Sequence, residues 1–184
     1  MINVWFTSDL HLGHRNIIRY CNRPFDSVED MDATLLANLN SKVGENFLGD
    51  FCLGGTDQGR LYRDRIICRN IHMIEGNHDP TLRELTGAFC SWNQMAEIRA
   101  GGQRIVLCHY AMRVWHHSSR GVWHFYGHSH GKLPDDPTSL SIDVGVDSHD
   151  FRPWHFHEIR TVMETKRRAR ELRDEGPKGD QQQT

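Results

Sequence analysis

Short apolar runs alternate along the chain with polar segments that contain turn-forming residues, and this alternation predicts a succession of strands and helices. The expected strands are rich in β-branched and aromatic residues and cover residues 3–8, 47–48, 71–74, 104–108, 122–126 and 140–146. Helical spacing or composition predicts helices over residues 14–20, 28–41, 61–68 and 158–173. Strands that alternate with helices in this way predict an α/β fold.

Two helix starts have recognisable signals. Ser27 is a typical N-cap residue, and Asp30 stands at the capping-box position three residues later. Apolar residues then recur at helical spacing, at Met31, Leu35, Leu36 and Leu39. A further helix is expected to open at Pro80 and Thr81, because proline is favoured in the first helical turn.

The length and composition are those of an ordinary globular protein with one domain. The 184 residues suffice for a single hydrophobic core, and we assign the domain to residues 1–174. Residues 175–184 are polar, contain Gly and Pro, and are expected to form a disordered tail. The net charge of −2 gives no electrostatic signature of general nucleic-acid binding, so nucleic acid is not indicated as a partner.

The cysteines and the apolar runs limit the class of protein further. Five cysteines are scattered without a C-x-x-C pair, which argues against a disulfide framework or a Cys-based zinc site. No apolar run approaches the ~18 residues of a membrane span, so no membrane partner is expected. A cytoplasmic, reducing compartment is the expectation, and the oligomeric state stays open.

Polar residues able to bind metals follow the predicted strands five times. Ligands of open α/β sheets gather in the crevice beyond the carboxyl ends of the strands, so five such ends would converge on one site. The chain also contains 13 histidines, a residue that ligates metals and transfers protons near neutral pH.

The first two of these positions are weak signals when taken alone. Asp9 and His11 are two residues apart, and in an extended segment they would share a face and could hold one ion. Asp50 supplies a carboxylate that can bridge two cations. The alternatives are a surface Asp and His and a turn aspartate, and for the isolated motifs these are the better interpretation.

The segment Gly76-Asn77-His78-Asp79 is more informative. The Asn77 amide oxygen is a neutral, hard donor, and His78 is free to donate a proton. Asp79 would orient the His78 ring. The alternative is a turn in which Asn77 and Asp79 cap the following helix.

The last two positions are His109, which follows a strongly apolar strand, and the segment Gly127-His128-Ser129-His130. A lone histidine at such a strand end is more often structural than a ligand. An H-x-H pair opened by glycine places two imidazoles on one side. The alternative is a pair of solvent-exposed histidines.

Taken in order, the sequences DLHLGH, FLGDF, GNHD, CHY and GHSH resemble the motifs of the calcineurin-like metallophosphoesterase superfamily. The resemblance covers roughly residues 4–153. The chain is most similar to small single-domain phosphoesterases of bacterial and phage type, which share its N-terminal stretch and a segment like Val144 to Trp154. The resemblance implies an α/β sandwich of two mixed β-sheets flanked by helices.

The resemblance also implies a role for each motif residue. The first metal ion would be held by Asp9, His11 and His130. The second would be held by Asn77, His109 and His128. Asp50 would bridge both ions, and His78, with Asp79 beside it, would be catalytic near the leaving group. The segment 43–48 has fewer apolar residues than the corresponding family strand, which makes Asp50 the ligand whose placement depends most on the fold.

These roles lead to a hypothesis of phosphoester hydrolysis by a hydroxide bound to two metals, with His78 assisting the leaving group. The N/O ligand set without thiolate suits Mn, Fe, Ni, Co or Zn, and we expect manganese. Arg15 and Arg113 could contact the phosphate of a small-molecule phosphoester, although a solvated surface arginine is the favoured interpretation of each.

The substrate follows less directly from the sequence. The short chain leaves the centre open, which favours a phosphodiesterase or a broad phosphoesterase. The fold alone does not fix the substrate, because function depends on the site rather than the fold. The alternatives are a non-catalytic binding or scaffold module with the same fold, and a nuclease.

Overall fold

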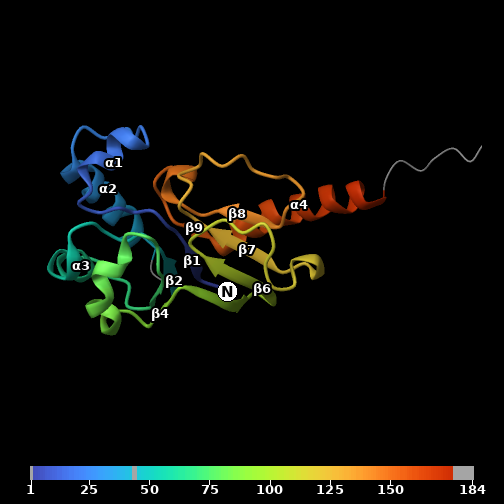
Figure 1. Ribbon diagram of the computed structural model, residues 1–184, viewed down its shortest axis with the longest axis horizontal. Coiled ribbons are helices and arrows are strands. Elements are labelled where there is room, and N and C mark those ends of the chain that lie inside the picture. Colours follow the sequence, from blue (N-terminus) through green and yellow to red (C-terminus); the bar gives the residue numbers. More distant parts are fainter. Residues whose placement is uncertain (1, 43–44, 176–184) are drawn as a thin grey trace, which may run out of the picture.

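Five strands form the first sheet of the computed structural model, which describes residues 2–42 and 45–175. Their order is β4 (Ser91–Asn93), β3 (Ile71–Ile74), β2 (Glu45–Leu48), β1 (Val4–Phe6) and β9 (Trp154–His155). Neighbouring strands run parallel except for β9, which is antiparallel to β1. The carboxyl ends of β1, β2 and β3 therefore lie at the same end of this sheet, of which Figure 1 labels β1, β2, β4 and β9.

Four strands form the second sheet, in the order β5 (Met95–Ala100), β6 (Gln103–Cys108), β7 (Trp123–Tyr126) and β8 (Ser141–Asp143). The first pair is antiparallel and the other two pairs are parallel. Both sheets are thus mixed, and the expected α/β architecture of two mixed sheets flanked by helices is confirmed.

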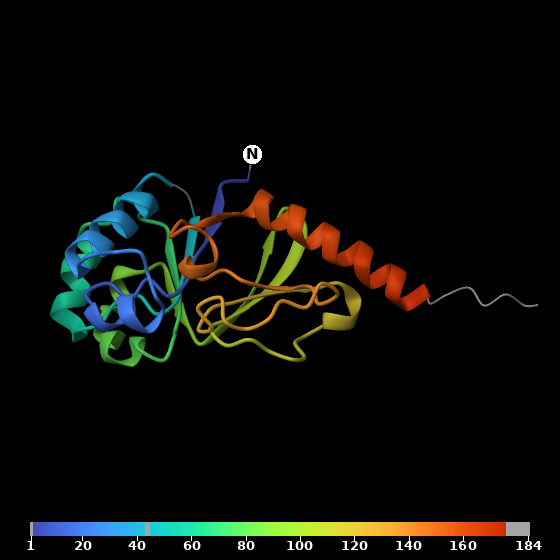
Figure 2. The same cartoon turned by 90° about the horizontal axis from the view of Figure 1, so that it is seen from above.

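Helices cover the two outer sides. Figure 2 shows the short helices α1 (Arg15–Tyr20), α2 (Val28–Asn40) and α3 (Gly55–Asp64) on one side of the first sheet, and α4 (Phe156–Glu175) on the opposite side of the molecule beside the second sheet. The described residues also contain three 3₁₀ segments: η1 (Asp79–Ala88), η2 (Ser118–Arg120) and η3 (Val146–Ser148). Within the described residues, no helix has both the length and the apolar character needed to cross a membrane.

The side chains of the first sheet divide between two hydrophobic clusters, because successive residues of a strand point to opposite faces. Ile71 and Met73 pack with the helices α1 to α3, whereas Ile74 and Phe6 pack with the second sheet and α4. Strand β3 is therefore covered on both faces, as its apolar sequence requires.

Several expected elements agree with the structure, and some need correction. The Ser27 hydroxyl accepts the Asp30 N–H at 3.0 Å and begins α2 as predicted. The helix expected over 61–68 is wrong in its bounds: it begins at Gly55, which has a positive φ like the N-cap residue Gly54, and it ends at Asp64. Ile66 and Cys68, which lie beyond the end of α3, are buried in the connection to β3.

Other differences concern short or terminal segments. The strands β4, β5 and β9 are not among the predicted elements, because they are short or carry polar residues on one face. The predicted domain end at residue 174 lies one residue before the end of α4. Residues 43, 44 and 176–184 lie outside the described residues, so the expectations for the tail and for the start of the segment before Asp50 are not tested there.

We expect the contact between α4 and the second sheet to contribute strongly to stability. Ile159 is fully buried in this cluster, so Ile159→Ala should lower the free energy of unfolding by about 2–5 kcal/mol. Leu172 on the same helix is 71% exposed, and Leu172→Ala should change it by less than about 0.5 kcal/mol. Denaturant unfolding of both variants measures the difference. Equal effects would mean that the packing of α4 against the second sheet contributes little to stability.

Candidate metal centre

Strands from both sheets end at one place, and the segments that follow them are linked by backbone hydrogen bonds. The Asp9 N–H donates to the Gly49 carbonyl at 2.9 Å, which joins the ends of β1 and β2. The Gly127 N–H donates to the His109 carbonyl at 3.0 Å, which joins the ends of β6 and β7. The His128 N–H donates to the Asp9 carboxylate at 3.0 Å and connects the two sheets. The polar strand ends thus surround one site, as ligand sites of α/β folds do.

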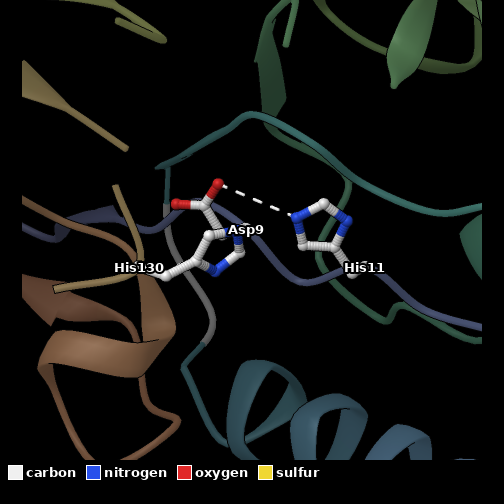
Figure 3. A group of neighbouring side chains, drawn as sticks. All are labelled: Asp9, His11 and His130. Carbon is white, nitrogen blue, oxygen red and sulfur yellow. Dashed lines mark ion pairs between the residues drawn. The ribbon is translucent and has the colours of Figure 1, made fainter. Parts of the chain in front are cut away.

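One group of possible ligands consists of Asp9, His11 and His130, whose donor atoms lie within 4.8 Å of one another (Figure 3). His11 Nε2 lies 4.0 Å from Asp9 Oδ1, and the His11 and His130 rings stack with centroids 5.1 Å apart. Asp9 and His11 are buried. These are the three residues that the family resemblance assigned to a first metal ion.

A second group contains Asp50, His109 and His128. The Asn77 amide oxygen belongs to it, 2.8 Å from His128 Nδ1 and 3.2 Å from His109 Nε2. His109 and Asp50 are buried, whereas Asn77 and His128 are exposed. The residues assigned by resemblance to a second metal are therefore also gathered in one place.

The Asp50 carboxylate faces both groups. Its Oδ2 lies 3.6 Å from His11 Nε2 and 3.2 Å from His109 Nε2, while Oδ1 accepts the His78 N–H at 3.0 Å. Burial raises the pKa of Asp50, but the hydrogen bond and charge of His109 outweigh it and bring the pKa to about 2. Strand β2 pairs with β1 and β3, so Asp50 follows a strand held on both sides despite the short apolar run before it.

The buried donors of the first group fit a cation. Both ring nitrogens of His11 are buried and have no hydrogen-bond partner within the described structure. Their separations from Asp9 and Asp50 are too long for hydrogen bonds, but donors that each lie ~2.0–2.2 Å from a shared ion are separated by about this much. Burial raises the pKa of Asp9 to about 7, more than the nearby histidines lower it, and burial lowers the pKa of His11 to about 3. A cation would supply the missing charge.

The backbone at the candidate ligands is strained. A positive φ is uncommon outside glycine and costs free energy unless the surroundings impose it. Nine non-glycine residues of the described chain have a positive φ, and five of them are candidate ligands: Asp9, His11, Asp50, His128 and His130, with φ between 45° and 65°. This concentration is typical of a functional site.

Several glycines, among them Gly76 and Gly127, bring the backbone against the carboxylates. A Cβ at Gly76 would lie 2.0 Å from Asp50 Oδ1. A Cβ at Gly127 would lie 2.2 Å from Ser8 Oγ and 2.5 Å from Asp9 Oδ2. Any larger residue would displace the candidate ligand, so these glycines are required by close approach rather than by chain flexibility.

The structure gives Asp79 a different place from the one expected. Its buried carboxylate accepts three backbone N–H groups, from Asp50 at 2.9 Å, Phe51 at 2.8 Å and Gly76 at 2.8 Å. No hydrogen bond between Asp79 and the His78 ring occurs within the described residues. Asp79 therefore fastens the segment after β2 to the segment after β3, and its assignment as a catalytic residue that orients His78 is corrected to this supporting contact.

His78 and the two arginines also have defined places. The half-buried His78 ring lies 5.0 Å from the His11 ring, and its donor atoms form a further possible ligand group with His11 and Asp50. Arg15 is exposed at the start of α1, next to His14. Arg113 is exposed and lines a separate pocket of about 220 Å³ with residues of η2 and α4, so it is not brought to the candidate metal centre.

Sequence reasoning missed the residues that support the ligands. Asp147 accepts from His130 Nδ1 at 2.8 Å and pairs with the buried Arg23. Tyr110 packs against the exposed His128 ring with centroids 4.8 Å apart. Neither Arg23 nor Tyr110 is a common metal ligand, so a search for ligand types passes over them. Asp147 lies in the segment that carried the family resemblance, and that was the available signal.

No family model matches the sequence. The uncharacterized protein MJ1445 of Methanocaldococcus jannaschii is 30% identical over 185 residues, covering 95% of this chain and 98% of that protein. The gene 66 protein of mycobacteriophage L5 is 34% identical over 186 residues, covering 80% and 88%. The crystal structure of AQ665 from Aquifex aeolicus, a protein of unknown function, has the same fold, with a TM-score of 0.65, 20% identity, and coverage of 86% and 98%.

We expect the close approach at Gly76 to be necessary for metal binding. Gly76→Ala should push the Asp50 carboxylate away and weaken Mn²⁺ binding by about 10- to 100-fold, the range seen when the supports of a ligand are disturbed. Gly87→Ala, at a glycine with open space around it, is the matched control. Equilibrium dialysis of Mn²⁺ compares the two. Undiminished binding by Gly76→Ala would place the ion away from Asp50.

Proposed function

We propose that this chain, which belongs to the same protein family as MJ1445 and the gene 66 protein of mycobacteriophage L5, is a metal-dependent phosphoesterase with two metal ions. The observation that carries the proposal is the Asp50 carboxylate, whose Oδ2 lies within 3.6 Å of a histidine of each ligand group. A carboxylate between two sets of N and O donors suits a pair of divalent cations. The similarity of the five motifs to those of metallophosphoesterases supports the same conclusion.

The ligand assignment follows the two groups. Asp9, His11 and His130 would hold one ion. The other would be held by Asn77, His109 and His128, with Asp50 shared. The absence of thiolate from both groups favours Mn, Fe, Co, Ni or Zn over softer metals, and we propose manganese. Bound divalent cations would supply Lewis-acid stabilisation of the phosphoryl oxygens and activate a water molecule.

Residues at the solvent-facing side of the centre would give the substrate access to it, and one of them would donate the proton to the leaving group. Asn77 and His128 are exposed and His78 is half-buried, so the solvent-facing side of the centre carries these three residues. A phosphoester would approach from this side. The His78 backbone N–H is fixed to Asp50 Oδ1 at 3.0 Å, which keeps the residue beside the centre while its ring stays free to donate a proton to the leaving oxygen.

The substrate proposed is a small phosphodiester or a range of phosphoesters. Wild-type protein loaded with Mn²⁺ should hydrolyse bis-p-nitrophenyl phosphate, p-nitrophenyl phosphate or both, and the ratio of the two rates gives the diester preference.

EDTA should abolish the activity, and added Mn²⁺ should restore it. Asp50→Asn should abolish turnover and weaken metal binding. Hydrolysis that resists EDTA, or a loaded protein inactive toward all phosphoesters, would contradict the proposal.

The role of His78 has its own test. His78→Ala should lower kcat by about 100- to 10,000-fold, the usual contribution of a general acid, and leave two Mn²⁺ per chain. The loss should be smaller for esters with a nitrophenol leaving group, which leaves without protonation, than for alkyl esters. If the variant instead loses a metal ion, His78 is a ligand, as its grouping with His11 and Asp50 would permit.

A further inference from the structure

A buried arginine, Arg23, lies next to the first ligand group. The side chain of Arg23 is fully buried, yet it is charged and carries five N–H donors. Its Nε and Nη2 donate to the two oxygens of Asp147 at 2.8 and 2.7 Å. Burial of a guanidinium is costly unless it is paired and hydrogen-bonded, and this bidentate pair with a carboxylate satisfies both conditions.

The remaining donors of Arg23 hold the backbone at the candidate ligand Asp9. Nη2 donates to the Asp9 carbonyl at 2.6 Å, and Nη1 donates to the Leu10 carbonyl at 3.1 Å. Asp9 has a φ of 60°, a conformation that is retained only when its surroundings impose it. The hydrogen bonds from the charged Arg23 side chain to these two carbonyls help to hold Asp9 in this conformation.

The other partner, Asp147, acts on a different ligand of the same group. Its Oδ2 lies 2.8 Å from His130 Nδ1. A carboxylate at this distance accepts the Nδ1 proton, fixes the tautomer and leaves Nε2 as the nitrogen that can bind a cation. A thiol, Cys21, also lies near His130 and Asp147, but Arg23 and His130 already occupy the carboxylate.

We propose that Arg23 and Asp147 are positioning residues that set the geometry and affinity of the metal site formed by Asp9, His11 and His130. The pair joins three segments: the loop after β1, the loop after α1 and, 124 residues from Arg23, the 3₁₀ segment η3. Within the described part of the chain, neither residue forms a hydrogen bond or ion pair with the second ligand group, so the effect of the pair should be confined to one of the two ions. The inference rests on the proposed metal centre and not on the reaction.

The test measures Mn²⁺ binding by the full chain, with free Mn²⁺ followed by electron paramagnetic resonance during a titration. Asp147→Asn removes the charge that pairs with Arg23, and Arg23→Lys removes the bidentate fork. Each variant should bind one ion about 10- to 100-fold more weakly and bind the other nearly as the wild type does. Because either change leaves a buried charge poorly paired, the double variant Arg23→Met, Asp147→Asn, which has no unpaired charge, is measured beside them.

Arg63 provides a matched control. It is also a buried arginine whose Nε and Nη1 donate to two backbone carbonyls, those of Ala88 and Ile66, but it lies away from the ligand groups. Arg63→Lys should lower thermal stability without changing either Mn²⁺ affinity. A merely structural role for Arg23 and Asp147 would give this same result for their variants.

A second measurement does not need metal. In the metal-free wild type, the ¹⁵N resonances of His130 should report a proton on Nδ1, and the double variant should lose this single tautomer. Wild-type binding of both ions by all three Arg23 and Asp147 variants would overturn the inference and leave the proposed function intact. A wild type that binds no Mn²⁺ would overturn both, whereas two ions without hydrolysis would overturn the proposed function alone.

Discussion

The left-handed backbone conformation of Asp9, His11, Asp50, His128 and His130 is the constraint on which the centre depends. Each such residue costs of the order of 1–3 kcal/mol, and its conformation persists only if surrounding contacts over-determine it. The loops after the strands must therefore be held more firmly than ordinary loops.

The loops are held by hydrogen bonds between their backbone atoms and the side chains of buried charged residues. Asp79 accepts three N–H groups from the segments that carry Asp50 and Gly76. Arg23 donates to the carbonyls of Asp9 and Leu10. One anion thus fixes the loops after β2 and β3, and one cation fixes the loop after β1. Arg23 is buried and paired with Asp147, so removal of Asp147 would leave the buried guanidinium uncompensated.

The two-sheet architecture explains why these loops meet. Phe6 and Ile74 of the first sheet pack against the second sheet, and the Phe6 and Phe125 rings meet edge to face with centroids 4.8 Å apart. This contact brings the carboxyl ends of β1 and β7 together, where the His128 N–H reaches the Asp9 carboxylate. Asp9, Asp50 and Asn77 follow strands of the first sheet, and His109, His128 and His130 follow strands of the second. The relative placement of the sheets therefore decides whether the ligand groups form.

The sequence by itself indicated the α/β class and the N-cap of α2 at Ser27, because alternation and capping are local properties. The list of candidate ligands came instead from the order of five motifs that resemble those of a known family. The sequence placed α3 too late and missed β9, because short elements owe their conformation to tertiary contacts more than to their own residues. It also gave Asp79 the wrong partner, since the backbone N–H groups of residues 28 and 29 positions away are brought to it only by the pairing of β2 with β3. The pairing of Arg23 with Asp147, 124 residues apart, is likewise decided only by the fold, because no local pattern records which buried charges will meet.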